Sequence, residues 1–549
     1  MIHFALGGYQ SAFDSTCAKL RQDHVVERLQ ARDYTLWKPN PDEIVNRLGW
    51  LDTPATTLEK IHYIRAVLEP LLGKNPRDAV LLGIGGSSLA AEVFNTIIGG
   101  KDGFPRLHIL DTTDPLLISA TAQNLDPADT IFLVSSKSGT TLEIISLFKY
   151  FYNLALKNGG KNTGSRFVFI TDEGSPLVKT AEAISAHFTF FSNSDIGGRF
   201  TALSLTGMVP AAVVGINVEK LLQKVVSNAS SLMNTGMSLG AALGTLASKG
   251  CDKLTLILPP HWKAFGDWLE QLIAESTGKE GKGILPVLDE PVRDQNTFGR
   301  DRVFVFFQHG KRARMDAIQS LTDSGHPVIT VQINEDDDLV RQMYIWEVAT
   351  AVAAHIMRVN PFDQPDVEAT KKYTRAVITD LDQDTGEKPV ITFEQTEIFG
   401  KVEGKAPKEI LNQFLKQAQA GGYICLQNYL SPSPETDESV NLLRRVISEK
   451  YFLPVTCGYG PRYLHSTGQL HKGDSGNGLF IQLTQNYTSD VDIPDNIGET
   501  KSSLSFGALK AAQAKGDRQA LTEAGRKIIR FHFLKNPAAG LKMMANLLS

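Results

Sequence analysis

The sequence predicts an α/β protein with two doubly wound parallel-sheet domains, a helical N-terminal region and a third, small α/β unit near the C-terminus. Three observations support this class. The 549 residues exceed what one hydrophobic core normally holds. Short apolar runs alternate with helical segments in two successive cycles, as in parallel sheets that carry helices on both faces. Glycine- and serine-rich turns follow two of these runs, at the positions where such folds bind ligands.

Composition excludes several classes of partner. With 42% hydrophobic residues, 21% charged residues and a net charge of -4, the chain gives no reason to expect nucleic acid or a membrane surface as a partner. The longest apolar stretch, 201–216, is interrupted by Pro210 and is too short to span a bilayer. The four cysteines form no CxxC pair and no disulfide framework, and the N-terminus lacks a signal-peptide pattern. We therefore expect a cytoplasmic protein.

The N-terminal region covers residues 1–75 and is predicted to be helical. Apolar residues recur at spacings of three and four over 42–50 and over 57–68, which is the helical period. The first sheet domain is placed at 76–225. Its strands are expected in the apolar runs 79–84, 107–110, 131–134 and 167–170.

The second sheet domain is placed at 226–379. Its expected strands are 254–258, 303–307 and 328–333, and its expected helices are 261–275, 311–322 and 340–358. Two similar α/β cycles in one chain suggest a duplicated domain with a site between the copies.

A polar break at 380–389 is interpreted as a linker. It resembles a calcium-binding loop, but Gly386 comes one position late and the terminal glutamate is missing. The C-terminal α/β unit is placed at 380–549. It is expected to contain helices at 407–419 and 437–449, strands at 423–426, 453–457 and 479–483, and a helical tail over 505–534.

The turn at 135–141 carries five hydroxyl side chains and Lys137 between a predicted strand and a predicted helix. A helix N-terminus offers free N–H groups and the positive end of the helix dipole, so this turn is suited to a phosphate monoester. One serine here would be an ordinary N-cap, but this number of hydroxyls exceeds what capping needs. The turn at 83–88 also joins a strand to a helix, and its glycines let a ligand approach the backbone. It lacks the third glycine of the dinucleotide-binding fingerprint.

Three further stretches carry candidate functional side chains. Arg199 follows two glycines and could recognise an oxyanion, although on the residues alone a surface ion pair is the better explanation. Gln271 and Glu275 lie one turn apart on a predicted helix, and the negative end of the dipole near Glu275 suits a general base. On the residues alone, a solvated surface glutamate is the better explanation of Glu275. Gln364 and Lys371 lie two turns apart on one face of a helix that begins near Pro365.

No stretch supports a metal or nucleotide cofactor. There is no HExxH, no His/Cys cluster and no Walker lysine motif, so neither a metal ligand nor a cofactor is predicted. His465 and His471 lie in a glycine-flanked turn.

Taken together, these stretches resemble the glucose-6-phosphate isomerase family, which is built on paired sugar-isomerase (SIS) domains. The matching stretches are GIGGSS (83–88), SSKSGTT (135–141), GGRF (197–200), QLIAESTGKEGKG (271–283) and NPFDQPDVEATKK (360–372). RDYTLWKPNP (32–41) and GPRYLHSTGQLHKG (460–473) are similar to the isomerase half of bifunctional transaldolase/glucose-6-phosphate isomerase fusions. No transaldolase half is present, so the resemblance implies a stand-alone relative or an excised domain.

The resemblance implies reversible isomerisation of glucose 6-phosphate and fructose 6-phosphate through a cis-enediol, without metal or cofactor. Glu275 would be the base and Arg199 would stabilise the enediolate. Lys371 would assist ring opening, and Gln271 and Gln364 would bind the substrate. The residues implied to hold the phosphate and orient the sugar are Gly86, Ser87, Ser136, Lys137, Ser138 and Thr141.

The ring-opening histidine is where this chain departs from the family pattern. Compact bacterial members carry it at the start of an HTDGG-like stretch, and here Leu321 occupies that position. The turn at 465–471 is similar to the histidine pattern of larger members, but it follows Lys371 in the chain. We therefore expect His465 to open the ring, with His471 second and His326 third.

Two alternatives stay open at this point. One is a non-catalytic regulator that binds sugar phosphates, although such a protein would not need Glu275, Arg199 and Lys371 together. The other is an isomerase that also accepts mannose 6-phosphate. The resemblance is compatible with a homodimer, and with fusion to or association with a transaldolase.

Overall fold

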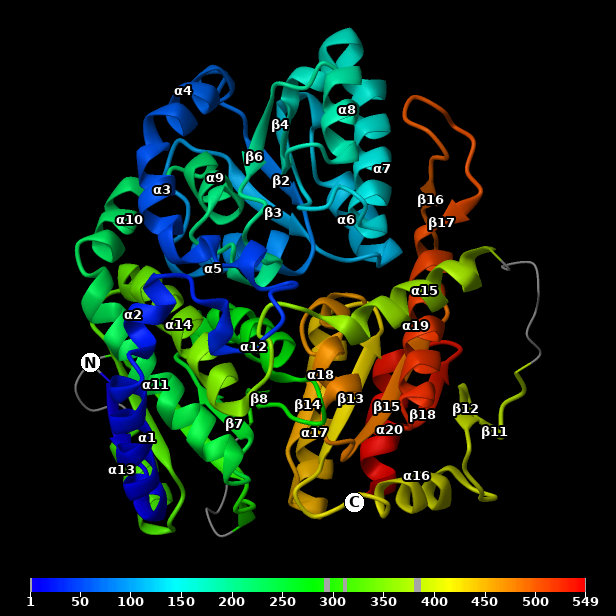
Figure 1. Cartoon of the computed structure of the whole chain (residues 1–549). Coiled ribbons are helices and arrows are strands. Elements are labelled where there is room, and N and C mark those ends of the chain that lie inside the picture. Colours follow the sequence, from blue (N-terminus) through cyan, green and yellow to red (C-terminus); the bar gives the residue numbers. More distant parts are fainter. Residues whose placement is uncertain (1, 291–296, 310–313, 380–386, 549) are drawn as a thin grey trace.

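The computed structural model describes residues 2–290, 297–309, 314–379 and 387–548, and these residues form three sheets that are mainly parallel (Figure 1). The first sheet has the order β3-β2-β4-β5-β6, and all its neighbouring strands are parallel. Its strands are β2 (Asp78–Leu82), β3 (Arg106–Leu110), β4 (Thr130–Ser135), β5 (Phe167–Asp172) and β6 (Phe188–Ser192). Strands β2 and β4 are buried along their whole length because helices cover both faces.

The second sheet has the order β1-β10-β9-β7-β8. Its parallel strands are β7 (Lys253–Ile257), β8 (Leu285–Leu288), β9 (Arg302–His309) and β10 (Val328–Ile333). Strand β1 (Ile2–Ala5) pairs antiparallel with β10 at the edge.

The third sheet has the order β11-β12-β18-β15-β13-β14. Its parallel strands are β13 (Tyr423–Tyr429), β14 (Val455–Tyr459), β15 (Gly478–Gln485) and β18 (Lys527–Phe533). Strand β12 (Thr396–Gly400) pairs antiparallel with β18 and with β11 (Ile391–Phe393). A short hairpin, β16 (Asp492–Ile493) and β17 (Leu504–Ser505), lies apart from this sheet beside α7 of the first unit.

All three sheets repeat one strand order. Numbered along the chain, the four parallel strands that begin each sheet are arranged 2-1-3-4, and a fifth strand follows them. That fifth strand is β6 in the first sheet, and the antiparallel strands β1 and β12 in the other two. In this order the connections leave the first and third strands in opposite directions, which opens a crevice at their carboxyl ends. We call this crevice the switch point; it lies between β2 and β4, between β7 and β9, and between β13 and β15.

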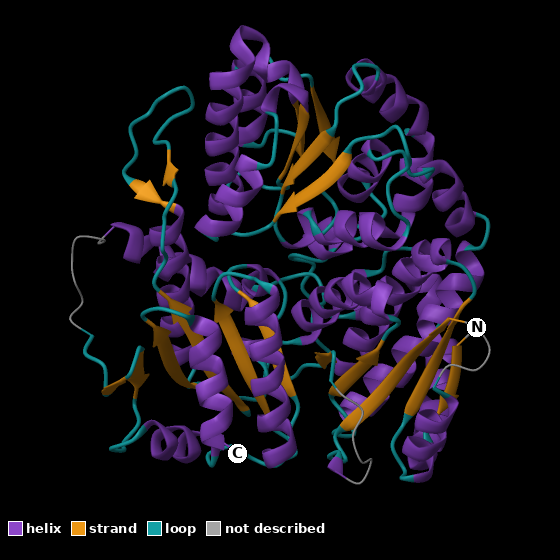
Figure 2. Cartoon of the chain, turned by 180° about the vertical axis from the view of Figure 1, so that it is seen from behind, coloured by secondary structure: helices purple, strands orange, loops and turns teal. Residues whose placement is uncertain are grey.

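Helices cover both faces of the sheets, as the view from behind shows (Figure 2). The N-terminal region and first unit contain α1 (Gln10–Gln22), α2 (Val25–Gln30), α3 (Thr53–Glu59), α4 (Ile61–Leu72), α5 (Leu89–Ile97), α6 (Pro115–Gln123), α7 (Leu142–Gly159), α8 (Pro176–Ala183), α9 (Leu205–Val213) and α10 (Val218–Val226). The second unit contains α11 (Ala229–Ser248), α12 (Lys263–Thr277), α13 (Met315–Asp323), α14 (Leu339–Met357) and α15 (Pro365–Thr379). The third contains α16 (Pro407–Leu415), α17 (Pro434–Tyr451), α18 (Gly468–Gly473), α19 (Phe506–Glu523) and α20 (Pro537–Leu548).

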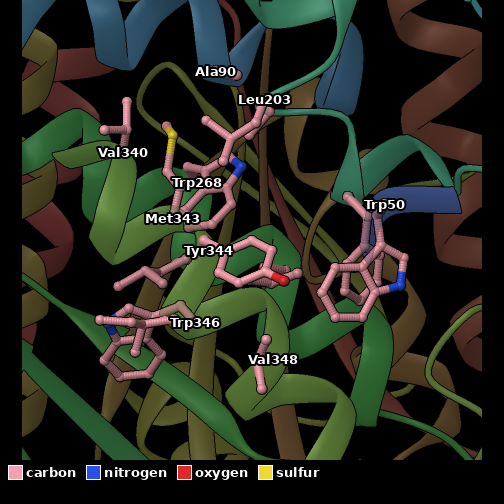
Figure 3. Packing of buried hydrophobic residues seen from close by; sticks show 14 of the residues in the cluster. Trp50, Ala90, Leu203, Trp268, Val340, Met343, Tyr344, Trp346 and Val348 are labelled. Atoms are coloured by element: carbon pink, nitrogen blue, oxygen red, sulfur yellow. The ribbon is translucent and has the colours of Figure 1, made fainter. Parts of the chain in front are cut away.

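One hydrophobic core joins the first two units. In Figure 3, Trp268 of α12 lies beneath Ala90 of α5 and Leu203, with Met343 and Tyr344 of α14 beside it. The third unit has a separate core around β13, β15 and β18. The third unit meets the second through a small cluster that includes Val287 of β8, Cys425 of β13 and Phe480 of β15, and α15 packs against α19.

The sequence predicted the fold class correctly, and the helices expected at 261–275 and 340–358 are α12 and α14. Two predictions at the chain ends are wrong. The N-terminal region is not wholly helical, because residues 2–5 form strand β1 and residues 42–50 contain a turn and short 3-10 helices in place of an α-helix. The tail over 505–534 is helical only to Glu523, since 527–533 form β18, which pairs with β15 inside the third sheet. Strand β18 alternates buried and half-buried positions, and this period of two is typical of a strand.

The expected domain boundaries at residues 75, 225 and 379 stay predictions. Most of the expected linker lies outside the described residues, which resume at Glu387. Among the helices in the described part of the chain, none combines the length and hydrophobicity needed to cross a membrane.

Candidate active site between the three units

The hydroxyl-rich turn lies at the switch point of the first sheet, between the end of β4 and the start of α7. The Ser136 hydroxyl accepts a hydrogen bond from the Gly139 amide at 3.2 Å and lies 3.4 Å from the Thr141 hydroxyl. The Ser138 and Thr140 hydroxyls are 3.0 Å apart. The side chains thus gather at the N-terminus of an 18-residue helix, where an anion is favoured.

Lys137 is oriented differently from its neighbours. Its ammonium donates to the Asp172 carboxylate and to the carbonyl oxygen of Ser194 at 2.9 Å. In this arrangement its charge is used to join the turn to the end of β5.

The glycine turn at 83–88 packs against the backbone that precedes Arg199. A β-carbon at Gly86 would lie 2.1 Å from the carbonyl oxygen of Gly198, and the Thr201 hydroxyl donates to the Gly86 carbonyl at 3.0 Å. Gly85 has a φ of +58°, and a β-carbon there would lie 2.8 Å from that of His465. Only glycine fits these two positions, which brings three separate segments of chain together.

Arg199 is buried and its guanidinium connects several of the predicted site residues. It lies 3.1 Å from Glu275 Oε1 and donates to Gln364 Oε1 at 3.0 Å. Its Nε donates to the Ser276 hydroxyl at 2.8 Å. Burial lowers the pKa of Arg199, while the Glu275 carboxylate opposes that shift. A guanidinium fixed this firmly can stabilise negative charge without reorganising.

Gln271 links Glu275 to the third unit. Its amide nitrogen donates to Glu275 Oε2 at 3.1 Å and to the carbonyl oxygen of His465 at 2.6 Å. Its amide oxygen is buried and accepts no hydrogen bond from any described residue. A buried acceptor without a donor is costly, so a ligand hydroxyl at this point would satisfy it.

A cavity of about 480 Å³ lies between the hydroxyl-rich turn, α15 and the third unit. Its wall includes Ser138, Thr140, Thr141, Glu143, Thr370, Lys371, Thr374, His465 and Gln513. The Lys371 ammonium is about half exposed and pairs with Glu368 on the same helix at 2.7 Å. The wall therefore combines hydroxyls, one ammonium and one imidazole, which suit a polyhydroxylated anion.

Of the three histidines considered for ring opening, only His465 belongs to this cavity wall. Its Nε2 lies 3.1 Å from Glu143 Oε1, which also accepts a hydrogen bond from Gln513 at 2.8 Å. Burial alone would raise the pKa of the Glu143 carboxyl, but the hydrogen bond and charge of His465 outweigh burial and lower it. Glu143 thus fixes the orientation of the His465 ring.

His471 and His326 are core residues. His471 is buried beside Cys425, and burial lowers its pKa well below the usual value. His326 packs edge-on against Phe298 and Phe304.

Several residues of the site were missed from the sequence. Glu143 and Gln513 orient His465, but an acid in a first helical turn normally indicates only a helix start. Lys279 donates to the Asn360 carbonyl at 2.7 Å and to Asp363 Oδ1 at 2.7 Å, which holds the 360–363 turn beside Arg199. Burial, reinforced by the charge of Arg199, lowers the pKa of Lys279 to about 8. The glycine-rich stretch around Lys279 is the sequence feature that could have indicated its part in the site.

A partly buried ionic junction lies behind the cavity. Arg462, three residues before His465, pairs with Glu92 and with Asp111 at 3.2 Å, and lies 3.8 Å from Asp267. The Ser466 hydroxyl donates to Glu270 at 3.0 Å. The loop that carries His465 is thus held by carboxylates of both other units.

Comparison with known proteins supports the fold and the motifs. The family model described as phosphoglucose isomerase matches residues 64–279. The glucose-6-phosphate isomerase of Limosilactobacillus reuteri (strain DSM 20016) is 27% identical over 402 residues, which covers 60% of this chain and 87% of that protein. The glucose-6-phosphate isomerase of Rubrobacter xylanophilus is 28% identical over 409 residues, covering 64% and 93%.

Two solved structures share the fold. A glucose-6-phosphate isomerase from Chlamydia trachomatis aligns over 70% of this chain and 89% of its own, with 16% identity and a TM-score of 0.53. A hypothetical protein from Thermus thermophilus aligns over 68% of this chain and 99% of its own, with 23% identity and a TM-score of 0.57. The chain is therefore similar to glucose-6-phosphate isomerases, both in the family model that matches residues 64–279 and in relatives that are 27–28% identical over 60–64% of its length.

Proposed function

We propose that this chain interconverts glucose 6-phosphate and fructose 6-phosphate by ring opening and proton transfer through a cis-enediol. The contact of Arg199 with Glu275 and Gln364 is the observation that supports this most strongly. In this contact the Glu275 carboxylate can accept the C2 proton. The buried Arg199 guanidinium beside it can stabilise the resulting enediolate. Glu275 then returns the proton to C1 while the proton of the C2 hydroxyl passes to the C1 oxygen, so the isomerisation is balanced without any redox partner.

The two ends of the substrate would be held separately. Ser136, Ser138 and Thr141 at the N-terminus of α7 would bind the phosphate, with the backbone at Gly86 and Ser87 orienting the sugar. Lys137 would act on the phosphate only through its general positive charge, because its ammonium is paired with Asp172. The free amide oxygen of Gln271 would accept a hydrogen bond from a sugar hydroxyl beside Glu275.

Ring opening would use His465 and Lys371. The imidazole would donate a proton to the ring oxygen while the C1 hydroxyl loses one, and Lys371 would assist from the same cavity wall. Glu143 would hold the ring orientation during this step. In this proposal, side chains of this chain carry out the ring opening and the proton transfer.

The test of the base is a coupled assay of fructose 6-phosphate turnover with wild type and Glu275→Gln. The carboxamide keeps the shape but cannot accept the C2 proton, so kcat should fall by about 10²–10⁴-fold. Glu280→Gln, an exposed neighbour, is the matched control and should retain wild-type turnover. Normal turnover of Glu275→Gln would overturn the base assignment, and an inactive wild type that still binds the sugar phosphate would favour the regulator.

The test of His465 compares two rates in His465→Ala. Isomerisation from the cyclic sugar should slow much more than solvent proton exchange into open-chain substrate. His471→Ala does not serve as a control because its ring is buried in the core. Equal slowing of both rates would refute a role in ring opening.

Three narrower predictions carry over from the resemblance. Turnover of mannose 6-phosphate would identify a broader isomerase, because it requires the C2 proton to be returned to either face. The homodimer and the association with a transaldolase stay predictions that a mass measurement in solution can test.

A further inference from the structure

The switch point of the second sheet carries a cluster of side chains that the proposed isomerisation does not use. His261 follows β7, His309 ends β9, and Asp336 follows β10. In the sheet register Ile333 pairs with His309, which brings the chain leading to Asp336 beside that histidine. One ligand atom of each side chain lies within 4.8 Å of the others. This is the position that the hydroxyl-rich turn occupies in the first sheet.

We propose that His261, His309 and Asp336 form a binding site for a divalent transition-metal ion of the zinc class. Two imidazoles and one carboxylate are the donor set that such ions prefer, with a fourth position left for water. The site is separate from the proposed reaction, because His261 precedes α12 and Glu275 lies about 20 Å away along that helix.

The distances fit tetrahedral coordination after small side-chain movements. Zinc bonds of about 2.0–2.2 Å place two ligand atoms about 3.3 Å apart on a tetrahedral ion. Here His261 Nε2 is 3.1 Å and His309 Nε2 is 3.9 Å from Asp336 Oδ1, and all three ligand atoms lie within 4.8 Å of one another. The three side chains are each 43–46% exposed, so they can rotate toward a common ion with little resistance.

Two features orient the ligands in advance. The indole nitrogen of Trp262, a fully buried residue, donates to Asp336 Oδ1 at 3.0 Å and fixes the carboxylate. Such an outer hydrogen bond is typical of metal ligands. Pro259 and Pro260 precede His261 and restrict the backbone that presents it. Ligands held this way lose less entropy when an ion binds.

The three ligands would tie together the connections that leave three neighbouring strands. Because the ion binds the folded arrangement and not the separated ligands, it should raise the unfolding temperature of the second unit. No local pattern in the sequence indicates this site, since the ligands come from three separate stretches without a spacing motif.

The experiment is a titration of the full chain, stripped with a chelator, with Co²⁺ and Zn²⁺. We expect one equivalent of Co²⁺ to give visible absorption of tetrahedral intensity, and Zn²⁺ to displace it. His309→Ala and Asp336→Asn should each weaken Zn²⁺ binding at least tenfold, as loss of a ligand does. His62→Ala, an exposed histidine on α4, is the matched control and should bind as wild type does.

Thermal unfolding provides the second measurement. Zn²⁺ should raise the unfolding temperature of wild type and of His62→Ala, and leave that of His309→Ala unchanged. Absence of a saturable one-to-one signal, or equal affinity in His309→Ala, would overturn the proposal. Isomerase turnover should be the same in His309→Ala, so failure of this site and failure of the proposed function are distinguished.

Discussion

The first and third sheets have the same strand order, but their switch points differ: the first borders a cavity and the third is occupied by a side chain of another unit. At β2 and β4 the crevice opens on the hydroxyl-rich turn and the cavity. At β13 and β15 it is closed by Asp114 of the first unit, whose carboxylate accepts from the Ser431 hydroxyl and from Lys510, both at 2.7 Å. Lys510 also donates to the carbonyl oxygen of Leu430 at 2.9 Å.

This difference shows that strand order determines where a crevice forms, and that the loop residues determine whether the crevice is accessible to a ligand or filled by another unit. The order of strands opens a crevice at the carboxyl ends whatever the sequence. In the first sheet, small and hydroxylated residues leave that crevice accessible. In the third, a buried lysine attracts a carboxylate from another unit, and the crevice becomes a docking point between units.

The largest expected effect comes from breaking the closed crevice. Asp114→Ala leaves the Lys510 ammonium, only 1% exposed, without its carboxylate. Removing one partner of a buried ion pair typically costs about 3–5 kcal/mol. We expect a matching fall in the free energy of unfolding, measured by urea denaturation.

The double variant Asp114→Ala/Lys510→Met tests the explanation. Removing both charges should restore most of the lost stability, because no uncompensated charge remains buried. Additive losses in the double variant would show that the pair does not act as a unit.

The next effect concerns the loop that runs between the two crevices. Arg462→Met leaves Glu92, Asp111 and Asp267 close together without their cation, which should cost about 3 kcal/mol at pH 7. Burial raises the pKa of Asp111 and of Asp267 to about 6, with Arg462 opposing the shift. Without Arg462 both groups hold protons more tightly, so the loss should shrink at pH 5. A loss independent of pH would contradict this account.

A smaller effect distinguishes the open crevice from the closed one. Ser138→Ala removes a hydroxyl from the turn proposed to bind phosphate, and hydrogen bonds to charged groups contribute about 1.5–3 kcal/mol. We expect KM for fructose 6-phosphate to rise at least tenfold with little change in kcat. Ser431→Ala, the corresponding hydroxyl in the third sheet, should leave KM unchanged, and a similar rise in both variants would remove the contrast.

The smallest expected effect is a change of stability with pH. Burial, followed by the charge of Asp267, raises the pKa of Glu270 to about 8 from an ordinary 4.5. A raised pKa means that the folded state holds a proton that the unfolded state releases between these two values. The stabilising contribution is therefore complete below pH 4.5 and is lost as the pH rises through 8.

Glu270→Gln should remove this dependence. The variant should match wild type at pH 5 and exceed it at pH 9. A shift from 4.5 to about 8 would correspond to about 5 kcal/mol for a fully buried group. Because Glu270 is only half-buried, solvent screening reduces the expected difference to on the order of 1 kcal/mol. Thermal denaturation at both pH values measures it. If the stabilities of wild type and Glu270→Gln change equally between the two pH values, Glu270 ionises like an exposed carboxyl and the prediction is wrong.

Local patterns accounted for most of the correct predictions. The apolar runs of the first two sheets and the period of α12 are readable because each lies within a short stretch. The errors lie where pairing partners are distant. Strand β1 pairs with β10, more than three hundred residues away, and β18 was taken for helix because its alternation is short.

For the candidate site too, local patterns identified individual residues, and the contacts between those residues depend on the tertiary structure. The motifs identified Glu275, Arg199 and Gln364 as candidates, but not their contact. Lys137 was expected to bind the phosphate, and this stays a prediction; its ammonium is paired with Asp172 on the next strand. Glu143 and Gln513 had no motif at all, since their role depends on a histidine from another unit.

By itself, the sequence determined the α/β class and the positions at which strands are followed by turns suited to ligand binding. It also determined that Gln271 and Glu275 lie on one face of a helix. These depend on interactions between residues close in the chain, which periodicity and turn chemistry record. Only the tertiary structure decided which histidine borders the cavity, where Lys137 points and that the third sheet repeats the order of the first two. Those outcomes depend on burial and on charges brought together from distant segments, for which no local pattern exists.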